Sequence, residues 1–185
     1  APMSLFGLFN KNNEPNLEGI EPIEAMANPT TIAAPVTGAV IERTDVERDI
    51  FSEGLLGCGC GIKPQNEVVY APVNGTVTVE YAGSQHAIGF VSEGGAQVIV
   101  HVGIDTVAME GKGFTYLVEQ GDGVKAGQPV LAFSREAIAE AGYDDIVTVA
   151  VVNADDFERV ELVQHGHVDA GQILLEFTDE RHREP

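Results

Sequence analysis

Basic residues are scarce in this chain. Lys and Arg together number 10 against 29 Asp and Glu, which gives the 185 residues a formal net charge of −19 at pH 7. Nucleic acids and anionic membrane surfaces select for clustered Lys and Arg, so the balance argues against both as partners. It favours solubility, and it favours either a protein partner that is basic where it meets this chain or no such partner.

Long apolar runs and disulfide-forming cysteines are also missing. No run approaches the roughly 18 apolar residues that a membrane-spanning helix needs, and no secretory signal pattern is present. The two cysteines, Cys58 and Cys60, are separated by one glycine, which is too close for a comfortable bridge. Such a pair alone cannot complete a zinc site. We therefore expect two reduced thiols in a cytoplasmic protein.

Trp is absent and glycine is abundant, and the chain repeats itself. Residues 34–40 (APVTGAV) recur as residues 71–77 (APVNGTV), and residues 124–133 (VKAGQPVLAF) recur as residues 168–177 (VDAGQILLEF). Matched turn-plus-strand units in the same order imply a duplicated β motif. The predicted fold is therefore all-β: an antiparallel sandwich or flattened barrel built from a duplicated hairpin motif, with one or two short helices. The helix candidates are residues 134–141 and 154–161.

The composition divides the chain into three parts. Residues 1–30 mix Asn, Glu and Pro and read as a flexible leader, whose apolar start at residues 4–9 could touch a membrane. Residues 31–177 form the predicted domain, and residues 178–185 form a charged tail.

A predicted hairpin carries two histidines. Residues 86–91 and 96–102 suit strands, and the glycines between them suit a tight turn. With a two-residue loop at Glu93-Gly94, the register places Ile88 opposite Ile99 and His86 opposite His101. All four side chains then share one face. A slip of one residue would move the histidines to opposite faces, so the inference depends on the register.

A pair of facing imidazoles suits phosphoryl chemistry. The carbonyl of Gly103 could accept the Nδ1 proton of His101, which leaves Nε2 with a free lone pair as a nucleophile towards phosphorus. His86 could donate a hydrogen bond to a phosphoryl oxygen and disperse the developing charge. Ser84, two residues away, could orient His86 or bind the phosphoryl group itself.

The stretch Gly95–Val107 (GAQVIVHVGIDTV) resembles the phosphorylation-site signature of the glucose-type enzyme IIA of the bacterial phosphoenolpyruvate-dependent sugar phosphotransferase system. The likeness extends through APVTG, GCGCGIKP, APVNG and VKAGQPV, and covers most of residues 32–177. It implies an all-β sandwich-like barrel in which His101 accepts a phosphoryl group from the carrier HPr. His101 would pass that group to a cysteine of an enzyme IIB domain. By the same likeness His86 is the partner imidazole, and Ser84 stands where the family usually has Thr.

The resemblance also implies a docking surface for HPr, which is an apolar patch ringed by carboxylates. Asp105 matches one carboxylate, and Asp49 could supply another because Arg48 stands where many relatives have Asp. The apolar patch positions are Ile50, Phe51, Leu55 and Val107. The membrane would be reached only through the transporter or weakly through the leader, and no metal or organic cofactor is obligatory.

Two alternatives remain open, and a third does not fit the sequence. A zinc hydrolase could use His101, Asp105, His165 and His167, although this leaves His86 unused and places the two later histidines before the second VxAGQ unit. A binding-only module could hold a zinc ion at His86 and His101 where a partner docks. A biotin or lipoyl carrier needs a lysine at a hairpin tip, a setting that the lysines of this chain do not fit; the candidates are Lys63, Lys112 and Lys125.

Overall fold

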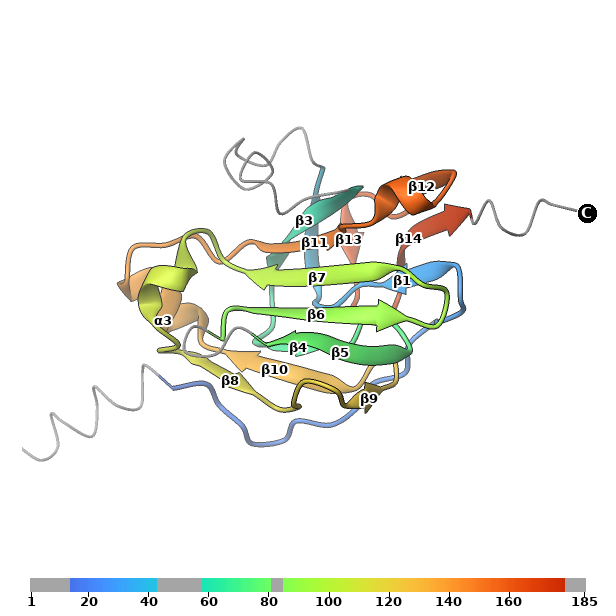
Figure 1. Cartoon of the computed structure of the whole chain (residues 1–185). Helices are drawn as coiled ribbons and strands as arrows, with labels where there is room; N and C mark the ends of the chain where they lie inside the picture. The colour runs from blue at the N-terminus through green and yellow to red at the C-terminus, as the bar shows by residue number, and fades with distance from the viewer. Residues whose placement is uncertain (1–13, 43–57, 81–84, 179–185) are drawn as a thin grey trace, which may run out of the picture.

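The computed structural model describes residues 14–42, 58–80 and 85–178. Within these residues the chain is almost entirely β, with one α-helix, two short 3-10 helices and no closed barrel. None of the described helices has the length and apolar character needed to cross a lipid bilayer. Every strand pairing is antiparallel (Figure 1), which confirms the predicted fold class.

Eight strands form the largest sheet. In spatial order they are β13 (His167–Val168), β2 (Gly38–Ile41), β3 (Cys58–Pro64), β11 (Val147–Val151), β7 (Gln97–Val102), β6 (Ala87–Ser92), β5 (Gly75–Glu80) and β9 (Gly123–Val124). Two three-stranded sheets complete the fold: β1 (Thr31–Ala33), β14 (Ile173–Thr178) and β12 (Arg159–Leu162), and β4 (Val68–Tyr70), β10 (Pro129–Phe133) and β8 (Phe114–Tyr116).

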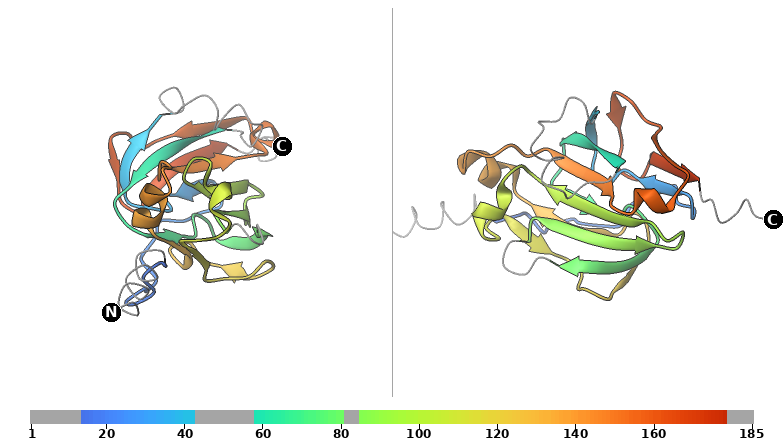
Figure 2. Two further views of the ribbon diagram at one scale, coloured as in Figure 1. Left: turned by 90° about the vertical axis from the view of Figure 1, so that its left-hand side faces the viewer. Right: turned by 45° about the horizontal axis from the view of Figure 1, so that its top comes forward.

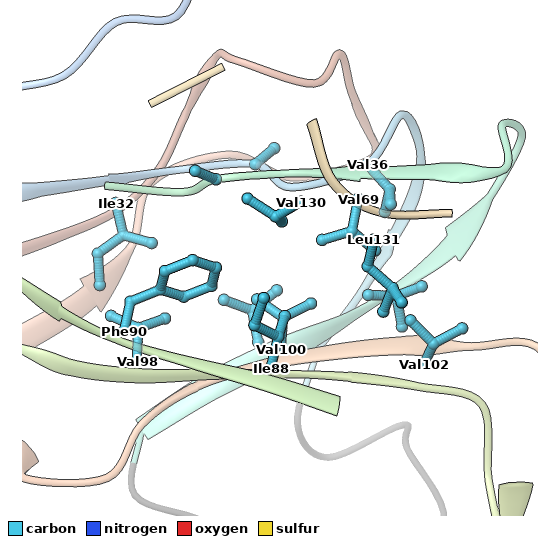
Figure 3. Close-up of a cluster of buried hydrophobic side chains, with 14 of the residues drawn as sticks. Ile32, Val36, Val69, Ile88, Phe90, Val98, Val100, Val102, Val130 and Leu131 are labelled. Carbon is cyan, nitrogen blue, oxygen red and sulfur yellow. The ribbon is translucent and has the colours of Figure 1, made fainter. Parts of the chain in front are cut away.

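The core lies between these sheets and is built from β-branched and aromatic side chains. Figure 3 shows side chains of the large sheet facing those of the smaller sheets and of the loops that follow them. The labelled members are Ile32, Val36, Val69, Ile88, Phe90, Val98, Val100, Val102, Val130 and Leu131, each at most 1% exposed. Burying a side chain of this size contributes about 1.5–3 kcal/mol, so this layer is the main stabilising element of the fold.

The duplicated units interlock. The amide and carbonyl of Ala34, in the first APVxG unit, bond to the turn of the second VxAGQ unit at 2.8 and 2.9 Å. The same groups of Ala71, in the second APVxG unit, bond to the turn of the first VxAGQ unit at 2.8 and 2.9 Å. Each copy therefore completes the other, as the repeats predict.

Part of the predicted leader packs onto both of these turns. The amides of Ile23 and Met26 donate to the carbonyls of Gly127 and Gly171 at 3.0 and 2.8 Å. Both glycines have φ near +90°, and a Cβ atom on either would lie 2.4 Å or less from a leader carbonyl oxygen. The leader runs along the lower edge of the molecule in Figure 1 before it enters β1. The domain boundary at residue 30 stays a prediction, but residues 23–26 are bonded to the domain.

Both helix predictions can be compared with the structure. α3 (Arg135–Glu140) begins where expected, because the Ser134 hydroxyl caps it by accepting from the Ala137 amide at 3.1 Å. The second prediction is wrong: residues 154–156 form only a 3-10 turn, η3 (Ala154–Asp156), and the chain then enters β12. In β12 the apolar Val160 and Leu162 alternate with charged residues, and pairing with β14 outweighs the helical start.

The hairpin of β6 and β7 forms with its ends within one residue of the prediction, but its register differs. Ala87, not His86, lies opposite His101, and Val91 lies opposite Gln97. The loop has three residues instead of two: Ser92 and Ala96 close it through a 2.9 Å backbone bond. A three-residue hairpin loop needs one residue with a left-handed φ, and Gly95 supplies it with a φ of +85°.

The observed register changes which side chains share a face of the hairpin. Ile88 and Phe90 point into the core together with Val98 and Val100, and each is at most 1% exposed. His101 lies on the opposite face of β7, so the prediction that it shares a face with Ile88 and Phe90 is wrong.

Candidate phosphoryl-transfer site

The predicted site falls partly outside the described residues. The positions that lie outside are Ser84, Arg48, Asp49, Ile50, Phe51 and Leu55. His86, His101, Gly103, Asp105 and Val107 are described, and they gather where β6 begins and β7 ends, on the side of the molecule that carries α3 (Figures 1 and 2).

The two imidazoles are in contact despite the changed register. Their ring centroids lie 4.6 Å apart with an interplanar angle of 75°, an edge-to-face arrangement. His86 is in a bend just before β6, and Gln85 ahead of it has φ of 50°. The strict alternation of strand side chains therefore ends before His86, although its carbonyl still accepts from the Val102 amide at 2.7 Å. The predicted pair is present, and a backbone bend produces it.

His101 is held neutral by its surroundings. Burial is the largest cause, and the neighbouring His86 is the second; together they lower the pKa of His101 from 6.5 to about 4. The backbone of Gly103 acts in the opposite sense by favouring the protonated ring. Nδ1 of His101 is buried and makes no hydrogen bond of standard geometry, so the predicted bond to Gly103 is present only as a looser contact.

The Gly103 corner that follows His101 tolerates only glycine. Its φ is +80°, and a Cβ atom would lie 2.3 Å from the Thr106 methyl carbon. The amide of Gly103 donates to Ile146 at 2.8 Å, and that of Ile104 donates to Asp144 at 3.0 Å, so the segment before β11 supports the corner. The Thr106 hydroxyl donates back to the Val102 carbonyl and closes the turn.

Asp105 and Val107 lie at the surface beside this corner. Asp105 is exposed and stands at the position just before η2 (Thr106–Met109), where its side chain makes no capping hydrogen bond and its φ of 61° is left-handed, an uncommon conformation for a residue other than glycine. Val107 is 56% exposed, one of the few large apolar side chains that the described residues leave open to solvent. An exposed carboxylate next to an exposed apolar side chain is compatible with docking, but the remaining patch positions lie outside the described residues.

Thr148 is a neighbour of His101 that the sequence reasoning missed. It lies directly opposite His101 on β11, and Gly61 on β3 lies directly opposite Thr148. Facing residues in such a ladder have Cβ atoms about 4.5–5.5 Å apart, so a buried hydroxyl stands beside the ring. Ala87 flanks His101 on the other side, so small side chains border the imidazole in this row. The one available signal was a polar residue within the otherwise apolar VTVAV strand.

The ligands of the zinc hydrolase alternative do not come together. His167 is on β13, four strands from β7, or about 19 Å along the sheet. His165 and His167 each contact a carboxylate near them, Glu42 at 2.8 Å and Asp169 at 2.9 Å. In the described parts of the chain no three His, Cys, Asp or Glu side chains are grouped so that they could hold a metal ion.

The structure agrees with the expectations for Cys60 and Lys63. Cys60 is a free thiol in the core, where burial raises its pKa to about 12. Lys63 lies within β3 and pairs with Asp144 and Asp145, so it is not at a hairpin tip as a carrier lysine would be.

Comparison with known proteins places this chain in a family. Residues 30–157 match the model of the phosphoenolpyruvate-dependent sugar phosphotransferase system, EIIA 1. The chain is 36% identical over 157 residues to the glucose-specific EIIA component of the phosphotransferase system of Bacillus cereus, a match that covers 85% of this chain and 86% of that protein. It is 41% identical over 146 residues to the beta-glucoside-specific EIIBCA component of Dickeya chrysanthemi, covering 79% of this chain and 23% of the relative.

A solved structure agrees with these relatives. Glucose permease IIA from Mycoplasma capricolum superimposes with a TM-score of 0.70 at 27% identity, over 78% of this chain and 93% of that one. The chain spans about a quarter of the length of the EIIBCA and EIICBA relatives and most of the length of the separate EIIA components. With the family model matching residues 30–157, the chain belongs to the EIIA type 1 family of the phosphoenolpyruvate-dependent sugar phosphotransferase system.

Proposed function

We propose that this chain is a cytoplasmic phosphoryl carrier that accepts a phosphoryl group from HPr on His101 and passes it to a cysteine of an enzyme IIB domain. The observation that carries the proposal is the contact between His86 and a His101 ring that burial keeps neutral. A neutral imidazole retains the lone pair that attack on phosphorus requires. Membership in the family adds sugar phosphotransfer as the setting.

The first transfer forms an N–P bond and breaks one. Because Nδ1 of His101 is buried, Nε2 is the nitrogen that a donor can approach. Its lone pair forms the new bond while the bonding pair to phosphorus returns to the donor's imidazole. The His101 ring keeps its Nδ1 proton and becomes positively charged, a form that the Gly103 backbone favours.

The second transfer reverses the change at His101. Burial, the dominant influence on the ring, disfavours its positive charge, and this destabilises the phosphorylated form relative to an exposed phosphohistidine. An attacking thiolate of enzyme IIB forms the S–P bond while the N–P pair returns to Nε2. His86, at 4.6 Å between ring centroids, is near enough to donate to a phosphoryl oxygen in both steps.

No step in this scheme needs a metal or an organic cofactor. Two imidazoles are half of a tetrahedral zinc site, so a zinc ion at His86 and His101 would need ligands from a docked partner. Asp105 and Val107 are the described positions offered to HPr, and the acidic balance of the chain suits a donor that presents positive charge.

The test is intact-mass analysis after incubation with phosphoenolpyruvate, enzyme I and HPr. We expect one acid-labile phosphoryl adduct on the wild type and none on His101→Gln. His86→Gln should still accept the group but pass it slowly to enzyme IIB. An unmodified wild type that is purified with stoichiometric zinc would overturn the carrier function in favour of metal binding.

A further inference from the structure

A buried carboxylate lies behind the corner that follows His101. Asp145 is 8% exposed, and its two oxygens are taken by two cations from different elements. Lys63, on β3, donates to one oxygen, and Arg135, the first residue of α3, donates to the other at 3.0 Å. Lys63 also reaches Asp144 at 3.4 Å. This set of four charged side chains, the Asp145 cluster, ties β3, α3 and the start of β11 together.

Asp145 and Lys63 stabilise each other in their charged forms. Burial acts to raise the pKa of Asp145, but the hydrogen bonds and charges of Lys63 and Arg135 outweigh it and hold that pKa below its ordinary value. The pKa of Lys63 is raised, mainly by its hydrogen bond to Asp145. A buried ion that loses its partners is costly, so each member constrains where the others can lie.

The backbone beside Asp145 holds the corner after His101. The carbonyl of Asp144 accepts from Ile104, and the carbonyl of Ile146 accepts from Gly103. The Asp144 carboxylate accepts from the Ile146 amide at 3.0 Å, which fixes the segment internally. Residues 144–146 thus touch the corner on both sides of Asp145 itself.

We propose that Asp145 is a positioning residue for phosphoryl transfer at His101. Its pairs with Lys63 and Arg135 fix residues 144–146, and these residues fix Gly103, whose backbone acts on the His101 ring. The proposal rests on the proposed function of His101. The side-chain partners described for Asp145 are Lys63 and Arg135, and the adjoining backbone contacts the Gly103 corner, so we assign its influence on His101 to that corner.

The corner has little freedom to absorb a shift. A Cβ atom on Gly103 would lie 2.3 Å from the Thr106 methyl carbon and 3.0 Å from the Asp144 carbonyl oxygen, so both residues pack closely against the corner. Movement of residues 144–146 must therefore move Gly103 or break its hydrogen bonds. Either change alters the packing that keeps water from the His101 ring, and a misplacement of about 1 Å can cost on the order of a hundredfold in rate.

Asp145→Asn keeps the shape of the side chain and removes its charge. We expect the His101 pKa, followed by NMR, to rise from about 4 towards 6.5 as water reaches the ring. The rate of phosphorylation at saturating phospho-HPr should fall on the order of tenfold. Lys63→Met should give a smaller change of the same sign, because Arg135 remains. Asp145→Glu, which restores the charge, should recover part of the rate.

Glu161→Gln is the matched control. It removes an exposed arginine–carboxylate pair, with Arg159 on β12, and both measurements should stay at wild-type values. All variants are compared well below their melting temperatures, which circular dichroism provides. If Asp145→Asn melts earlier but matches Glu161→Gln in ring pKa and rate, its role is only structural and the proposal is wrong. A wild type that accepts no phosphoryl group would overturn the proposed function instead.

Discussion

The low pKa of His101 predicts a specific dependence of stability on pH. In the folded protein the ring stays neutral down to about pH 4, whereas in the unfolded chain it takes up a proton near 6.5. The unfolded state therefore binds more protons between these values, and the free energy of unfolding falls as the pH falls through this window. The penalty is absent above 6.5 and complete below about 4, where it amounts to about 3 kcal/mol.

His101→Gln removes the titrating ring and should remove this penalty. Relative to the wild type, the variant should gain about 3 kcal/mol of stability as the pH is lowered from about 7 to about 4. Urea unfolding at several pH values in this range measures the difference directly. The comparison between variants matters because the many carboxylates of the chain contribute equally to the acid response of both proteins.

Gln97→Ala provides the control, because Gln97 is exposed on the same strand and face as His101 and cannot titrate in this range. Its stability difference from the wild type should not depend on pH. A flat difference for His101→Gln as well, or an NMR titration midpoint of His101 near 6.5, would refute the inference that burial keeps the ring neutral. His86→Gln should leave the His101 pKa well below 6.5, since burial outweighs the charge of His86 among its causes.

Three further predictions follow from single contacts. Gly103→Ala should destabilise the fold and slow phosphoryl acceptance, because the alanine methyl group would lie 2.3 Å from the Thr106 side chain and the residue would keep a left-handed φ. Thermal unfolding measures the loss of stability, and the mass assay measures the rate of acceptance. Thr148→Val keeps the shape of the residue facing His101 and removes its hydroxyl. A slower acceptance of the phosphoryl group with an unchanged melting temperature would show that the hydroxyl serves the reaction. An unchanged rate of acceptance would exclude that role. Cys60 should react with thiol reagents only at the rate of unfolding, since its thiol is buried with a pKa raised to about 12; rapid labelling of the native protein at this position would contradict its placement.

The interlocked fold could be predicted from the sequence because the repeats are local and similar enough to align. The register of the hairpin could not be predicted in the same way. Glu93-Gly94-Gly95 permits a two-residue or a three-residue loop, and only the packing of Ile88 and Phe90 into the core selects the latter. The pair with His101 nevertheless forms, since the bend at His86 lies beyond the part of the strand that the register controls.

The missed features share a cause: their partners are distant in sequence. Lys63 reaches Asp145 across 82 positions, and Thr148 meets His101 through strand pairing alone. Similarly, residues 154–161 carry two acidic residues where a helix would begin, yet they enter a strand that pairs with β14. Local patterns identify segments and chemical groups, whereas contacts across the sheet depend on topology that no single segment encodes.

The duplication also accounts for where the site lies. The order of the large sheet is symmetric about the pairing of β7 with β11: β6 corresponds to β3, β5 to β2, and β9 to β13 on the two sides. His101 is therefore on one of the two central strands, flanked by a strand on each side and covered more completely than an edge position would be. The corresponding strand of the other half supplies Thr148 directly opposite it. The duplicated fold thus places His101 in the middle of its largest sheet, and burial there is the largest cause of the lowered pKa that keeps the ring neutral and able to react.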